Sequence, residues 1–131
     1  IFLLFAFISS CKKYEEGPSL SLKSRKERVA NHWKVKYYAM NNRDQTTQID
    51  TMAVRYLFKK DGYYFESMNH PGMAHALEGR WNFEINDTQI KIIRPSSDTL
   101  LYNILKLKEK EMWLKREISG ITFEFHLIPA E

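Results

Sequence analysis

Residues 79–93, GRWNFEINDTQIKII, carry the pattern that most restricts the fold. Before the pair Asn86-Asp87, every second residue is large and apolar, and the alternation resumes after it with Ile90 and Ile92. A period of two is typical of a strand with one buried and one solvated face. Asn and Asp tolerate the backbone angles of a tight turn. The stretch therefore predicts a β-hairpin with one apolar face.

The same alternation occurs through the rest of the chain and predicts eight strands. Two lie within 79–93, and the other six are expected near 32–40, 51–60, 63–68, 100–108, 111–117 and 121–127. Asp61-Gly62 is a strong hairpin signal, because Gly accepts a positive φ at little steric cost. An open sheet of eight strands would leave two unpaired edges, and closure removes both. We therefore expect an all-β fold, an eight-stranded antiparallel up-and-down barrel, preceded by a short helical turn at 25–31.

The first eleven residues differ from the rest of the chain. Residues 1–8 are apolar and uncharged, and they are too few to span a bilayer, which takes ~20 residues. They are typical of a signal-peptide core. Because the sequence begins without Met or a basic segment, we expect residues 1–10 to be a truncated signal peptide. Cys11, the only cysteine, cannot form an intramolecular disulfide, so in an exported protein it is free, paired with another chain or modified.

Ile8-Ser9-Ser10-Cys11 resembles the lipobox of Gram-negative bacterial lipoproteins. The resemblance implies that Cys11 becomes the first mature residue and carries two or three acyl chains, which would hold the protein at a membrane. Lys12 stands where an inner-membrane retention signal has Asp, so the resemblance implies a cell-envelope protein of the outer membrane, on either its periplasmic or its surface face. Polar residues 11–24 then predict a lipidated, flexible tether, and residues 25–131 the barrel domain.

The order of motifs within 31–129 is similar to the small lipocalin-like domain attached to bacterial lipoproteins. The motifs are an early Trp33 strand, KKDGYY, GRWNFEINDTQI and MWLKRE. The resemblance implies a barrel with one common interior. The chain departs from true lipocalins at its first strand, where Asn31-His32-Trp33 stands in place of Gly-X-Trp.

An eight-stranded barrel is wide enough either to be filled by its own side chains or to hold one small ligand. The strand patterns predict eight inward aromatic residues, which are the candidate ligand contacts: Trp33, Tyr37, Tyr56, Phe58, Trp81, Phe83, Phe123 and Phe125. One hypothesis is a cavity for a small hydrophobic or amphipathic molecule, with its mouth between the connections 41–50 and 69–76. The alternative is a solid barrel whose surface binds protein, glycan or anionic lipid head groups.

Motifs for catalysis and for metal binding are absent from the sequence. His70 and His75 are expected as solvated loop residues rather than metal ligands, and Glu66 and Glu84 as exposed strand carboxylates. We therefore expect a non-enzymatic monomer with no cofactor. The net charge of +4 does not indicate nucleic-acid binding, because the aromatic residues fall on the apolar face. Basic residues on two late strands predict either a solvated face or a patch for anionic head groups: Lys106, Lys108, Lys110, Lys115 and Arg116.

Overall fold

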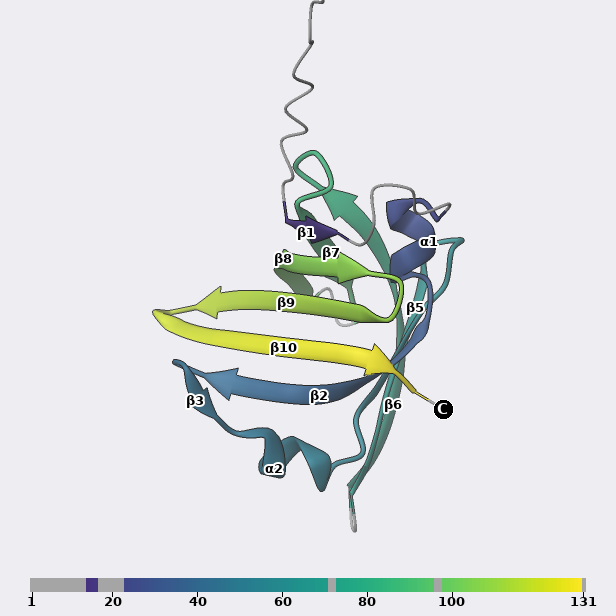
Figure 1. Ribbon diagram of the computed structural model, residues 1–131. Coiled ribbons are helices and arrows are strands. Elements are labelled where there is room, and N and C mark those ends of the chain that lie inside the picture. Colours follow the sequence, from purple (N-terminus) through teal and green to yellow (C-terminus); the bar gives the residue numbers. More distant parts are fainter. Residues whose placement is uncertain (1–13, 17–22, 71–72, 96–97, 131) are drawn as a thin grey trace, which may run out of the picture.

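The computed structural model describes residues 14–16, 23–70, 73–95 and 98–130, and they form a closed barrel (Figure 1). The elements in chain order are β1 (Glu15–Glu16), α1 (Arg25–Val29), β2 (His32–Met40), β3 (Arg43–Asp44), α2 (Thr46–Asp50), β4 (Arg55–Phe58), β5 (Tyr63–His70), β6 (Met73–Glu84), β7 (Gln89–Ile93), β8 (Thr99–Lys108), β9 (Glu111–Ile118) and β10 (Ile121–Pro129). The sheet runs β8-β7-β6-β5-β4-β2-β10-β9, and β9 pairs back with β8. The prediction of a closed eight-stranded antiparallel barrel is confirmed.

Because the strands run up and down in sequence, their connections gather at two ends of the barrel. At one end, which we call the closed end, α1 enters β2 and tight turns join β4 to β5, β6 to β7 and β8 to β9. At the other end, which we call the mouth, lie the β3–α2 connection, the β5–β6 hairpin and the β7–β8 and β9–β10 turns. The two ends differ in how they are filled, and this difference positions the candidate site.

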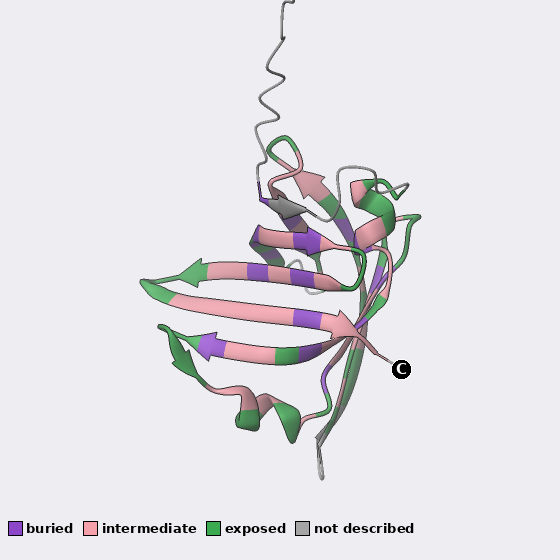
Figure 2. Ribbon diagram, viewed as in Figure 1, coloured by how far each residue is buried: buried purple, intermediate pink, exposed green. Residues whose placement is uncertain are grey.

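The closed end is filled by α1 and the first aromatic residues of the strands. Ser24 caps α1, its hydroxyl accepting a hydrogen bond from the backbone N–H of Glu27 at 3.2 Å. Val29 and Trp33 are fully buried, and the Trp33 indole N–H donates to the Val29 carbonyl at 2.9 Å. The buried bands alternate along β8 and β9, as expected for strands with one face in the core (Figure 2). A large indole with its polar atom satisfied therefore closes this end.

Several short elements differ from the sequence predictions. The second predicted strand, 51–60, is shortened to β4, and the polar connection before it contains α2. The predicted loop 69–76 is instead the distal part of the β5–β6 hairpin. Within the predicted tether, Tyr14 is buried in the core, and β1 pairs in parallel with β8 beyond the first residue of β7. The signal-peptide and Cys11 predictions lie outside the described residues.

A β-bulge in β2 reverses which side chains face the interior. Leu127 pairs with Val35 and His126 with Tyr37, so Lys36 is an extra residue in β2. Since side chains alternate along a strand, one extra residue turns the following side chains to the opposite face. The prediction that Tyr37 faces inward is therefore wrong, and its neighbour Tyr38 faces inward instead.

On the outer surface, Tyr37 joins a row of stacked side chains across four strands. The Tyr37 and His126 ring centroids are 4.6 Å apart, and the His126 and Trp113 rings stack at 3.8 Å with an angle of 3°. The Lys106 ammonium lies 3.7 Å from the Trp113 centroid. These contacts lie across directly paired residues, so the row stabilises the register of β2, β10, β9 and β8 from outside.

Gly79 allows two strands to cross closely near the mouth. A Cβ atom built on Gly79 would lie 2.4 Å from the carbonyl oxygen of Ile93, far closer than any van der Waals contact allows. The backbone of Ile93 and Arg94 therefore passes directly over the inward face of β6 at this point. This crossing brings Arg94 over the barrel interior, where it contacts residues of the candidate site.

Replacing Gly79 tests this close approach. We expect Gly79→Ala to lower the free energy of unfolding by ~1–3 kcal/mol, as for an overpacked core, because the Ile93 backbone must shift. Ala76→Ser, an exposed substitution in the same strand, should change stability by less than ~0.5 kcal/mol. Urea unfolding followed by circular dichroism measures both, and equal stability of the two variants would contradict the crossing.

Candidate ligand-binding cavity

A cavity of about 310 Å³ opens at the mouth of the barrel, between α2 and the strands. Its lining combines apolar and aromatic residues with a few polar ones: Tyr38, Gln48, Ile49, Met52, Val54, Tyr56, Glu66, Ser67, Met68, His75 and Phe125. Below it, Tyr56 and Phe125 also border a space of only about 10 Å³ that reaches Phe58 and Tyr102. The lower half of the interior is therefore packed, and the open volume lies in the mouth half.

The eight predicted aromatic contacts occupy different parts of the barrel. Tyr56 and Phe125 line the cavity, whereas Phe58 lies beneath it. Trp33, Trp81 and Phe83 belong to the packed core or contact it. Phe123 faces inward opposite Arg116, with its ring centroid 6.5 Å from that of Tyr38, and Tyr37 lies outside. The structure thus brings two of the eight to the cavity.

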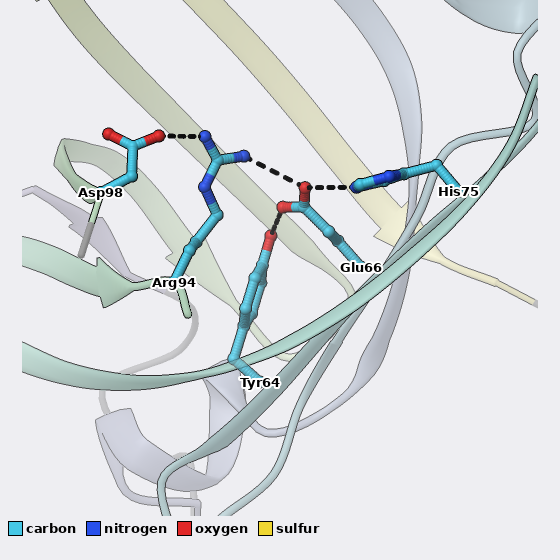
Figure 3. A network of polar contacts seen from close by, with 5 residues as sticks. All are labelled: Tyr64, Glu66, His75, Arg94 and Asp98. Atoms are coloured by element: carbon cyan, nitrogen blue, oxygen red, sulfur yellow. Dashed lines mark hydrogen bonds and ion pairs between the residues drawn. The ribbon is translucent and has the colours of Figure 1, made fainter. Parts of the chain in front are cut away.

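Glu66 is the centre of a polar network on the cavity wall that the sequence analysis missed (Figure 3). It pairs with inward-facing Tyr56 and Leu77, and its side chain is only 15% exposed. The Tyr64 hydroxyl donates to its Oε2 at 2.5 Å, Arg94 Nη1 donates to its Oε1 at 3.2 Å, and His75 Nε2 lies 3.8 Å from Oε1. The prediction of an exposed carboxylate at Glu66 is wrong, and so is the loop prediction for His75, which lies on β6.

Arg94 joins this network to the rim of the mouth. Its Nη2 donates to Asp98 Oδ2, and its Nη1 to Glu66. The hydrogen bond from Arg94 lowers the pKa of the Asp98 carboxyl, and the same bond raises the pKa of Arg94. Arg94 is thus held by two carboxylates, and these three groups together carry one net negative charge.

Phenol groups lie in the cavity wall, at Tyr38 and Tyr56, and beneath it, at Tyr64 and Tyr102. Burial raises the pKa of the Tyr56 hydroxyl well above its usual range, and the Tyr102 and Glu66 groups act in the same direction. Burial is also the first cause of the raised pKa of Tyr38, Tyr64 and Tyr102. These hydroxyls therefore remain neutral and able to donate at physiological pH. The hydroxyls of Tyr38 and Tyr56 hydrogen-bond to no residue of the described part of the chain.

Arg116 also faces the interior at the mouth. It pairs with inward-facing Phe123, one step along β9 and β10 from Leu114 and Phe125. Its guanidinium carbon lies 6.0 Å from the Tyr102 ring centroid, and its charge opposes the rise that burial causes in the pKa of the Tyr102 hydroxyl. The expected basic face of β8 and β9 is therefore interrupted, because Arg116 points inward and Lys106 lies over Trp113.

Comparison with known proteins does not assign this chain to a family. Neither a scan against protein-family models nor a search of the curated proteins found a match to this chain. Among the described residues, three or more His, Cys, Asp or Glu side chains nowhere gather as a metal site would require. No helix in the described ranges is long and apolar enough to cross a membrane.

Alkaline titration tests the interior tyrosines. A folded-state pKa above the ordinary value of 10.0 means that these groups contribute stability below pH 10 that is lost as the pH rises further. We expect Tyr56, Tyr64 and Tyr102 to ionise only above pH 10 and together with loss of the circular dichroism signal of the barrel. In denaturant, all seven tyrosines should titrate near 10. Full ionisation near 10 in a still-folded barrel would contradict this environment.

Proposed function

We propose that the chain is a non-catalytic binding protein that holds a small hydrophobic or amphipathic molecule in the mouth half of its barrel. The observation that supports this is the cavity of about 310 Å³, whose wall is mostly apolar with a few convergent polar groups. Sites for small molecules have this composition, with volumes of roughly 300–1,000 Å³. Because the cavity is at the lower limit, the ligand is small or leaves part of its length outside the mouth.

The inward carboxylate at Glu66 does not by itself support catalysis. Both of its oxygens accept hydrogen bonds, one from Tyr64 and one from Arg94. These two donors hold the Glu66 carboxylate inside the wall, an arrangement that is consistent with binding.

The alternative of a solid barrel that binds through its surface has less support. It needs a filled interior, whereas the mouth half is open. For anionic lipid head groups it also needs a continuous basic face, yet Lys106 covers Trp113 and lies 3.6 Å from Glu111. We therefore prefer the cavity as the binding site.

Blocking the cavity tests the proposed function. Met68 lines the cavity and is only partly buried, so a larger side chain at this position would extend into the open volume. We expect Met68→Trp to weaken the binding of decan-1-ol at least ~10-fold, a loss of ~1.4 kcal/mol, while the thermal midpoint is retained. Leu101→Trp places the same indole at an exposed outer position and should bind like the parent.

Native mass spectrometry of the gently purified chain gives a second measurement for the same proposal. A co-purified mass that is lost on unfolding, or uptake from a lipid extract, is the expected result. A clean apo mass without uptake, together with equal decan-1-ol titrations of parent and Met68→Trp, would contradict the cavity function.

We also propose that the protein is a lipoprotein of the cell envelope, anchored through acyl chains on Cys11. This proposal rests on the lipobox resemblance of residues 8–11. We expect Cys11→Ser to abolish labelling with radioactive palmitate and to release the protein from the membrane fraction. Ser10→Ala, which keeps a small residue beside the cysteine, should still be labelled, and labelled Cys11→Ser protein would refute the anchor.

A further inference from the structure

Arg116 is an inward-facing cation that forms no direct ion pair in the described part of the chain. Its strand, β9, otherwise presents Met112 and Leu114 to the interior, both buried. Arg94, the other arginine over the interior, binds two carboxylates, whereas Arg116 forms no ion pair with any described residue. Asp98 feels the charge of Arg116, but the Asp98 carboxylate is engaged by Arg94. A partly buried guanidinium is costly unless a counter-charge and acceptors satisfy it.

Tyrosine hydroxyls are the neutral hydrogen-bond donors that lead from this charge to the cavity. The Arg116 guanidinium carbon lies 6.0 Å from the Tyr102 ring centroid, and Tyr102 borders the small space beneath the cavity together with Tyr56. The hydroxyls of Tyr56 and Tyr38 belong to cavity-lining residues and hydrogen-bond to no residue of the described ranges. Arginine and phenol hydroxyls together are the donors that an oxygen anion accepts from.

We propose that the barrel recognises an amphipathic carboxylate, whose carboxylate is bound by Arg116 and the hydroxyls of Tyr102, Tyr56 and Tyr38. This inference rests on the proposed function and adds the chemical class of the ligand. The alkyl chain lies along the apolar side of the cavity, formed by Ile49, Met52, Val54 and Met68.

Probes with one chain length and three head groups separate the two proposals. Decanoate, decan-1-ol and decylammonium are titrated into the purified 131-residue chain at neutral pH by calorimetry. We expect decanoate to bind ~10- to 100-fold more tightly than decan-1-ol, as charge-assisted hydrogen bonds to arginine would give. Decylammonium should bind most weakly, because Arg116 repels it.

Matched variants assign the preference to Arg116. We expect Arg116→Gln to remove the preference for decanoate and to leave decan-1-ol within ~2-fold of the parent. Arg80→Gln makes the same change of charge at an exposed arginine that stacks on Tyr63, and it should keep the preference. Should Arg116→Gln not fold, Tyr56→Phe removes a single hydroxyl and should weaken decanoate ~2- to 10-fold.

The other outcomes would overturn the carboxylate inference alone or both proposals. Equal binding of decanoate and decan-1-ol, unchanged in Arg116→Gln, would overturn the carboxylate inference and leave the proposed function standing. Preference for decylammonium would also overturn it and would indicate that Glu66 selects the head group. Absence of binding by all three probes would overturn both proposals.

Discussion

The pairing of β8 with β9 closes the hydrogen-bonded ring, and the rest of the structure depends on that closure. Once the ring is closed, alternate side chains of eight strands share one narrow interior. Trp33, Phe58 and Trp81 fill its lower part, and α1 covers the end where they lie. The remaining interior volume lies at the mouth, between α2 and the strands. The position of the cavity is thus a consequence of where the large residues stand along the strands.

The mouth half contains charges that a packed barrel would exclude. Burying Glu66 requires donors, and Tyr64, Arg94 and the nearby His75 surround it. Arg94 reaches it because Gly79 lets the end of β7 cross β6. The absence of a side chain at Gly79 therefore determines where the Arg94 guanidinium lies. The phenols beside this network remain neutral through burial, which leaves hydroxyl donors facing an otherwise apolar space.

Sequence alternation predicted the strands well but the inward faces less well. Trp81, Phe83, Phe123 and Phe125 follow the period without interruption, and they face inward as predicted. Tyr37 faces outward, because the bulge at Lys36 shifts the alternation in β2. This bulge depends on how β10 pairs with β2, and the local sequence pattern does not show that pairing. The prediction that Glu66 is exposed was wrong for another reason, because a carboxylate in a strand is usually solvated. Its alternation with Tyr64 and Met68 was the available signal that it faces inward.

The sequence by itself determined the class of fold, because period-two alternation with tight turns leaves closure as the way to satisfy the strand edges. It also contains the lipobox resemblance on which the proposed anchor rests. Only the tertiary structure decided that the interior is half packed and half open, and that Arg94 and Arg116 face it. Those outcomes depend on bulges, crossings and the stagger of strands, which arise from contacts between residues distant in the chain. The chemistry of the cavity is therefore a property of the closed barrel, although each of its residues is visible in the sequence.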